Sequence, residues 1–208
     1  MIEFVGFTVG PLDTNCYIIW DKHSLKGAVI DPGGNKDQIL DECGTLGLDV
    51  QRVLLTHGHP DHTFCAGDIA ARLGARIGMH RADVVQHEAV LAVVGLYYDV
   101  TEHVRMAPDD LFADNELIRL GDVGVTVLHT PGHSEGGLCF VTDAGVFCGD
   151  TIFSGSIGRT DFPGGSYETL IRSIKEKLLV MDDGTPLYPG HGSATSVGSE
   201  RANNPFLQ

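Results

Sequence analysis

The amino-acid sequence predicts a single α/β domain over residues 1–208, and three observations lead to this fold class. Short runs of β-branched and aromatic residues alternate with longer segments of helical periodicity. The length of 208 residues fits one domain. Apolar residues make up 42% of the chain and charged residues 20%, which supports a hydrophobic core and argues against disorder. Alternation alone fits either an open sheet with helices on both faces or two packed sheets with helices outside.

The expected strands are short, and some of them read as buried on both faces. They cover residues 15–20, 27–30, 53–55, 123–128, 138–142, 146–148 and 186–188. Helical periodicity covers residues 37–46, 63–73, 82–94 and 167–179. Residues 95–115, which include Tyr97 and Tyr98, follow neither period. We expect them to form an irregular insertion, either as a packed surface loop or as part of a functional site.

Composition excludes several classes of protein. The net charge is −14, so the clustered basic residues that nucleic-acid phosphates require are not expected. No apolar run is long enough to span a bilayer, and the first residues lack the pattern of a signal peptide. The five cysteines are odd in number and form no C-x-x-C motif, so a disulfide framework is not expected. The simplest interpretation is a cytoplasmic protein that binds neither nucleic acid nor membranes.

A histidine-rich string directly follows the expected strand at residues 53–55. Residues 56–62 read THGHPDH. In an extended segment alternate side chains face the same side, so His57 and His59 can bind one ion. Pro60 is well tolerated at the start of a helix, so the chain can turn there and direct Asp61 and His62 toward a second point nearby. Isolated histidines are usually structural or solvated, but three with an aspartate at this spacing predict a metal site.

Three further candidate ligands follow later expected strands, each beside a glycine in a polar turn. They are His133, Asp150 and His191. Ligand-binding side chains gather at strand ends in α/β proteins, so these residues and the string can form one site. Imidazole and carboxylate ligands without thiolates suit zinc, iron or manganese. Five histidines and two aspartates do not saturate two ions, which favours a catalytic site over a structural one.

These motifs resemble the metallo-β-lactamase superfamily, and the resemblance covers nearly the whole chain. Residues 57–62 match its H-x-H-x-D-H signature, and the three later motifs follow in the expected order. Within the superfamily the chain resembles the glyoxalase II (hydroxyacylglutathione hydrolase) branch. It is most similar to the short members without a C-terminal helical domain, through PLDTNCY at 11–17, GSIGRTDFP at 155–163 and NPF at 204–206.

The resemblance implies a metallo-β-lactamase-type αββα sandwich, with two divalent metal ions per chain at one edge. It assigns the first ion to His57, His59 and His133. It assigns the second ion to Asp61, His62 and His191. Asp150 would bridge the two ions, since its oxygens accept separately. Zinc is the first expectation for the metal, with iron or manganese as alternatives.

The implied reaction is thioester hydrolysis, with S-lactoylglutathione cleaved to lactate and glutathione. A hydroxide between the metals would attack the acyl carbon, and Asp61 would both bind metal and orient that hydroxide. The resemblance therefore implies a small thioester linked to glutathione as the partner. The chain ends at Gln208, soon after His191, so the helical domain that carries much of the glutathione contact in glyoxalase II is not expected. Relatives often carry a polar side chain where this chain has Gly137.

The main alternative is a persulfide dioxygenase, because these oxidoreductases share the scaffold and resemble this chain at residues 158–162. They use one iron held at positions that match His57, His133 and Asp150, a two-histidine, one-carboxylate site. A nuclease on the same scaffold conflicts with the acidic composition, and a metal sensor without turnover conflicts with the open coordination.

Two supporting positions keep two interpretations each. Asp31 either makes a turn with the proline and glycines that follow it, or accepts a hydrogen bond from a ligand histidine. Arg159 either braces its loop by pairing with Asp161, or binds a substrate carboxylate through its planar fork.

Overall fold

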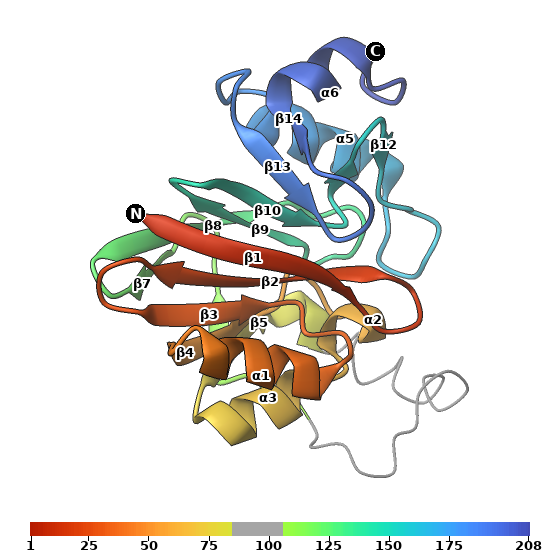
Figure 1. The fold of residues 1–208 in the computed structure, drawn as a ribbon. Helices are drawn as coiled ribbons and strands as arrows, with labels where there is room; N and C mark the ends of the chain where they lie inside the picture. The colour runs from red at the N-terminus through yellow and green to blue at the C-terminus, as the bar shows by residue number, and fades with distance from the viewer. Residues whose placement is uncertain (85–105) are drawn as a thin grey trace.

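The computed structural model describes residues 1–84 and 106–208. Two six-stranded sheets pack face to face, and helices cover the outer face of each sheet (Figure 1). This arrangement confirms the αββα sandwich and excludes the open single sheet. Within the described ranges, no helix combines the length and apolar character needed to cross a membrane.

The first sheet combines an antiparallel half with a parallel half. Its strands, in spatial order, are β1 (Ile2–Val9), β2 (Thr14–Asp21), β3 (Lys26–Ile30), β4 (Asp49–Leu54), β5 (Arg76–His80) and β6 (Asp110–Phe112). The pairs from β1 to β3 are antiparallel, and those from β3 to β6 are parallel. Helices α1 (Lys36–Thr45) and α3 (Ala66–Leu73) connect parallel strands and lie on the outer face (Figure 1).

The second sheet is antiparallel except for the pair formed by its second and third strands. Its strands, in spatial order, are β14 (Thr195–Ser196), β13 (Pro186–Pro189), β10 (Gly145–Gly149), β9 (Leu138–Thr142), β8 (Val123–His129) and β7 (Leu117–Leu120). Strands β10 and β13 run parallel, so their carboxyl ends lie at the same edge. The connection between them contains a short ribbon, β11 (Ile152–Phe153) with β12 (Ser156–Ile157), and then α5 (Tyr167–Ser173) with its π-helical continuation η1 (Ile174–Leu178). Helix α6 (Val197–Asn203) follows β14.

Three apolar layers hold the sandwich together. Ile18 on β2 packs toward α1 and α3, whereas its neighbour Ile19 packs between the two sheets with Phe140 and Phe147. Successive side chains of a strand point to opposite faces, so a strand covered on both sides needs an unbroken apolar run. A third layer lies between the second sheet and its helices and includes Leu170.

Most expected elements are present, with corrections at specific places. The helix expected at 63–73 is two helices, α2 (Pro60–Thr63) and α3, because the Cys65 N–H donates to Pro32 O (2.9 Å) instead of continuing the helix. The helix expected at 167–179 ends in the π-helical turn η1. The irregular segment expected at 95–115 is wrong at Asp110–Phe112, where β6 pairs with β5; the other described residues of that range, 106–109 and 113–115, form neither helix nor strand.

Other expectations lie outside the described residues or were incomplete. Of the helix expected at 82–94, only residues up to 84 are described, and these are helical. Tyr97 and Tyr98 lie outside the described ranges. Strand β1 was missed because its middle side chains are only partly buried, so no continuous apolar run marks it. Strand β5 was missed because it is short and contains Gly78, whose missing side chain makes room for the Phe112 ring.

Candidate metal centre

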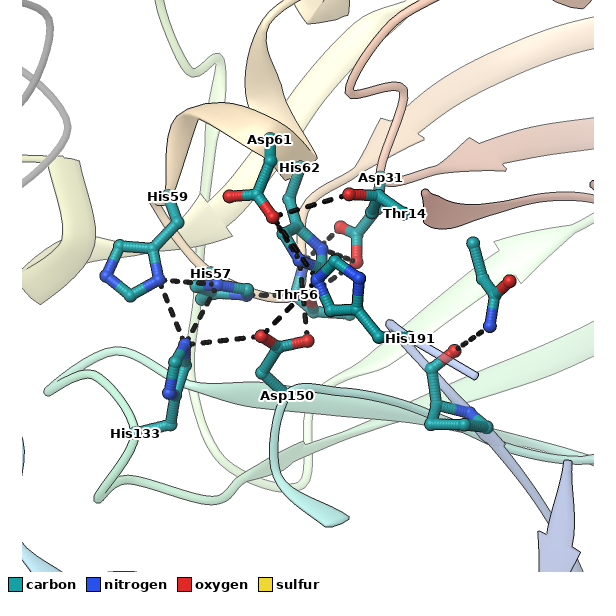
Figure 2. Close-up of polar contacts among 12 residues, drawn as sticks. Thr14, Asp31, Thr56, His57, His59, Asp61, His62, His133, Asp150 and His191 are labelled. Atoms are coloured by element: carbon teal, nitrogen blue, oxygen red, sulfur yellow. Dashed lines mark hydrogen bonds and ion pairs between the residues drawn. The ribbon is translucent and has the colours of Figure 1, made fainter. Parts of the chain in front are cut away.

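All seven residues expected to bind metal come together at one edge of the sandwich (Figure 2). The edge is formed by the carboxyl ends of β4, β8, β10 and β13, together with α2. The ends of β4 and β10 belong to different sheets, so the site spans both. The seven residues are His57, His59, Asp61, His62, His133, Asp150 and His191.

Three imidazoles form the first group. The Nε2 atom of His57 lies 3.0 Å from His59 Nδ1, and His133 Nε2 lies 3.2 Å and 2.9 Å from these two atoms. All three residues are buried. A tetrahedral ion with bonds of about 2.0–2.1 Å places its ligand nitrogens roughly 3.3 Å apart. The spacing of this group therefore fits a metal ion.

The second group consists of Asp61, His62 and His191. His191 Nε2 lies 3.2 Å from Asp61 Oδ2, and His62 Nε2 lies 3.5 Å from the same oxygen. The Asp150 carboxylate lies between this group and the first (Figure 2). Its Oδ1 is 3.4 Å from His62 Nε2, and its Oδ2 is 3.6 Å from His133 Nε2 and 3.7 Å from His191 Nε2.

Two polar atoms at the centre of this arrangement are buried without a hydrogen-bond partner among the described residues. They are His62 Nε2 and Asp150 Oδ1. A buried polar atom without a partner costs about 1–3 kcal/mol, so each such atom in a native protein calls for an explanation. A cation between an imidazole lone pair and a carboxylate oxygen satisfies both atoms, so the donor set fits a metal ion here as well.

Hydrogen bonds on the far side of the rings select the tautomer that leaves a lone pair at the centre. His133 Nδ1 donates to Arg159 O (2.8 Å), and His62 Nδ1 donates to Asp31 Oδ2 (2.9 Å). The Thr56 hydroxyl donates to the same Asp31 oxygen (2.6 Å), so it is free to accept from His57 Nδ1 (3.1 Å). Asp31 is therefore an acceptor for a site histidine, as the second of its two interpretations required.

The two groups differ in charge. Burial lowers the pKa of His57 well below its ordinary value, and the facing imidazoles lower it further. Burial, together with the neighbouring His133, lowers the pKa of His59 to about 4. These rings are neutral at pH 7, the form in which imidazole binds metal.

The carboxylates reverse this effect in the second group. Burial alone would lower the pKa of His62, but the carboxylates of Asp150 and Asp61 raise it well above its ordinary value. The same holds for His191. Burial alone would lower its pKa, but the hydrogen bond with Asp61 and the charge of Asp150 raise it. Burial would raise the pKa values of Asp61 and Asp150, yet the facing histidines hold both below the ordinary range.

Comparison with known proteins identifies the family. The profile of the metallo-beta-lactamase superfamily matches residues 9–191. The chain is 38% identical over 210 residues to hydroxyacylglutathione hydrolase GloC of Haemophilus influenzae, covering 99% of this chain and 97% of that protein. The chain belongs to the metallo-β-lactamase superfamily.

Two solved structures with the metallo-β-lactamase fold are also similar over nearly the whole chain. The B3 metallo-β-lactamase BLEG-1 has a TM-score of 0.88 at 28% identity, covering 99% of this chain and all of that one. TTHA1623, solved in a di-iron-bound form, has a TM-score of 0.86 at 32% identity, covering 98% of this chain and all of that one. These likenesses confirm the expected fold family.

In this metallo-β-lactamase fold, strand β2 holds the loop that carries His191. The Asn15 side-chain amide donates to Pro189 O (3.0 Å) and Gly192 O (2.9 Å), and its backbone N–H donates to Gly190 O (2.7 Å). The Tyr17 hydroxyl also donates to Pro189 O (2.8 Å). A Cβ atom at Gly190 would overlap Asp150 and His62, so only glycine lets the loop approach this closely. The motif at residues 11–17 does not by itself predict this role, because the hydrogen bonds join it to a loop more than 170 residues away.

A loop beyond β12 forms the rim beside the first group. Arg159 pairs with Asp161 through two hydrogen bonds (2.8 and 2.7 Å), so the interpretation of this pair as a brace is borne out in the structure. The guanidinium also lies 3.7 Å above the Phe162 ring, which meets the His59 ring edge-on at 5.6 Å. The contact of Phe162 with His59 was not predicted from the sequence. The feature that could have indicated it is an aromatic residue in a glycine-rich loop.

The remaining expectations concern residues near the site. The position of Gly137 has no room for a side chain, because a Cβ atom there would lie 2.8 Å from Thr130 O. Outside the seven candidate ligands, His80 and His129 stack on each other at 4.1 Å and join none of the converging ligand groups found among the described residues. His87 and His103 lie outside the described ranges.

Proposed function

We propose that this chain is a dinuclear metal-dependent hydrolase that cleaves thioesters, with glutathione thioesters such as S-lactoylglutathione as the substrate class. The observation that carries the proposal is the Asp150 carboxylate, which lies between two separate groups of ligand side chains. The similarity to hydroxyacylglutathione hydrolase GloC supports the choice of substrate.

The ligand assignment follows the two groups. His57, His59 and His133 would hold the first ion. Asp61, His62 and His191 would hold the second ion. Asp150 would contact both ions through its two oxygens. Zinc suits this imidazole and carboxylate set, iron and manganese accept the same donors, and the similar TTHA1623 structure contains two irons.

Bound divalent ions would supply Lewis acidity and lower the pKa of a coordinated water to roughly 7. The side chains of this chain would orient the attacking water. Asp61 is ionised at neutral pH, and its Oδ2 accepts from the Thr14 hydroxyl (3.3 Å) and faces His191. A carboxylate held in this way can accept a hydrogen bond from the attacking water and direct the lone pair of that water at the acyl carbon.

No residue is required as a covalent nucleophile. All five cysteines are buried and free. A thiolate is a good leaving group because thiol pKa values lie near 8.5, so its departure needs little help from an acid. Arg159 lies at the rim with its side chain 54% exposed. Its guanidinium can therefore contact a substrate carboxylate while it stays paired with Asp161.

A second candidate function, persulfide dioxygenation, is favoured by one observation. His57, His133 and Asp150 also converge, with His133 Nε2 3.2 Å from His57 Nε2 and 3.6 Å from Asp150 Oδ2. Two histidines and one carboxylate are the ligands of many non-haem iron enzymes that activate oxygen.

One pair of assays separates the two functions. Zinc-loaded protein should cleave S-lactoylglutathione without oxygen and release free thiol, because hydrolysis changes no oxidation state and zinc has no redox chemistry. His191→Ala should lose this activity, whereas His129→Ala, which removes a histidine outside the site, should keep it. Oxygen uptake by the ferrous protein with glutathione persulfide, without thioester cleavage, would overturn the hydrolase proposal.

A further inference from the structure

Asp83 is a fully buried carboxylate that belongs to none of the converging ligand groups. It lies in a helical turn at residues 81–84, just after β5. Its Oδ2 accepts from the Gly58 N–H (2.9 Å) and from the Ser134 hydroxyl (2.7 Å), and its Oδ1 accepts from the Gly136 N–H (2.6 Å). One buried side chain therefore binds two loops that are far apart in the sequence.

These two loops carry the whole first group. Gly58 lies between His57 and His59 on the loop after β4, whereas Ser134 follows His133 on the loop between β8 and β9. The loops belong to different sheets. A backbone hydrogen bond from Leu138 N to Thr56 O (2.7 Å) joins the strand ends, but Asp83 joins the ligand-bearing loops themselves.

Both loops approach Asp83 through glycine. A Cβ atom at Gly58 would lie 2.7 Å from Asp83 O, and one at Gly136 would lie 2.6 Å from Asp83 Oδ1. Real Cβ atoms do not approach other atoms so closely, so the contact is built for these residues and no larger ones.

We propose that Asp83 is a positioning residue for the first metal ion. It sets the distance between the two loops so that the three imidazole nitrogens of His57, His59 and His133 converge. The inference rests on the proposed metal centre and extends it to a residue that touches no ligand atom. Hydrogen-bond partners that orient ligands in this way are commonly worth about 10- to 100-fold in metal affinity.

The substitution Asp83→Asn tests the inference with little change in volume. The carboxylate accepts three hydrogen bonds, whereas an amide has one oxygen and an NH₂ group that only donates. If the amide oxygen keeps the Gly136 N–H, the NH₂ group faces the Gly58 N–H, donor against donor. The loop that carries His57 and His59 must then move away from the loop that carries His133.

Zinc affinity is the readout, measured by competition with a chromophoric chelator in a His191→Ala background. That background breaks the second group, so the remaining bound zinc reports the first. Asp83→Asn should weaken this zinc by about 10- to 100-fold. Ser134→Ala removes one of the three hydrogen bonds and alters little else, so it should weaken zinc binding at the first group by about 5-fold. This variant provides the test if Asp83→Asn does not fold.

Asp21→Asn is the matched control. Asp21 is also fully buried, and it accepts from the Ser24 hydroxyl (2.7 Å) and the Asp122 N–H (3.3 Å). It lies at the end of β2 remote from Thr14, roughly 23 Å along the strand. This variant should lower thermal stability and leave zinc affinity unchanged.

The outcomes separate the two proposals. Unchanged zinc affinity in folded Asp83→Asn and in Ser134→Ala, or an equal loss in Asp21→Asn, would show that Asp83 only stabilises the fold. If the His191→Ala parent and the unsubstituted chain both bind no zinc, the metal centre itself is wrong and both proposals fall.

Discussion

The substitution Asp31→Asn is expected to reverse a chain of hydrogen bonds behind the metal centre. Asp31 is buried and accepts from Thr56 N (2.8 Å), from the Thr56 hydroxyl (2.6 Å) and from His62 Nδ1 (2.9 Å). Its φ is 51°, a left-handed conformation that asparagine tolerates better than most residues. Asparagine therefore changes the hydrogen bonding without adding much backbone strain.

The consequence follows from donor counting. If the amide oxygen keeps the Thr56 N–H, the amide NH₂ replaces the oxygen that accepted from His62 Nδ1 and from the Thr56 hydroxyl. The neutral His62 ring that binds metal can pair with this NH₂ only by carrying its proton on Nε2. The Thr56 hydroxyl then accepts from the amide and donates to His57 Nδ1, so His57 also moves its proton to Nε2. Both rings would present an N–H to the metal in place of a lone pair.

The size of the effect can be worked from these contacts. If the rings do not switch, a buried donor faces a donor, at a cost of about 1–3 kcal/mol. For a chain of this size that lowers the melting temperature by about 2–12 °C. If the rings do switch, stability changes less, but zinc affinity falls by about 10- to 100-fold for each affected ligand. One of these two losses is unavoidable.

Two measurements check this prediction. Stepwise zinc competition gives both affinities, and nitrogen-15 NMR of the imidazoles reports which ring nitrogen carries the proton. Asp21→Asn again controls for the loss of a buried carboxylate remote from the site. Wild-type zinc affinity together with an unchanged melting temperature and an unchanged His62 tautomer would refute the reasoning.

Three further predictions follow from the same geometry. Asp150→Ala removes the carboxylate between the two groups, so thioester hydrolysis should fall by orders of magnitude while circular dichroism stays native; normal turnover would contradict the dinuclear mechanism. Asn15→Ala removes two hydrogen bonds to the loop of His191, so affinity for the second zinc should fall by about 10- to 100-fold. A competition titration measures this affinity, and an unchanged value would show that the loop keeps its position without Asn15. The raised pKa values of His62 and His191 mean that these rings bind protons as pH falls toward neutrality, whereas the lowered pKa of His57 leaves that ring neutral. Zinc binding at the second group should therefore displace more protons than binding at the first, and its affinity should fall more steeply on acidification. Calorimetry in buffers of different ionisation enthalpy measures this proton release, and equal release at both binding steps would count against the assignment.

Much of the fold could be predicted from local patterns. The buried strands β2, β9 and β10 were predicted because strands covered on both faces need unbroken apolar runs. Edge and short strands were not predicted, since β1 is only partly buried and β6 has three residues. The break between α2 and α3 depends on a hydrogen bond from Cys65 to Pro32, more than thirty residues away, which no local period records.

Residue type and spacing are enough to identify the candidate ligand side chains, because imidazole and carboxylate groups bind metal wherever they converge. His57 and His59 alternate on one extended segment, and His133, Asp150 and His191 each follow a strand. The groups that hold these side chains in place became visible only in the folded chain. Asp31, Asp83 and Asn15 act through hydrogen bonds to groups 25 to 177 residues away, on elements from both sheets. Such bonds depend on where folding brings backbone atoms together, and a carboxylate or amide in the sequence looks the same whether its partner is a distant loop or water.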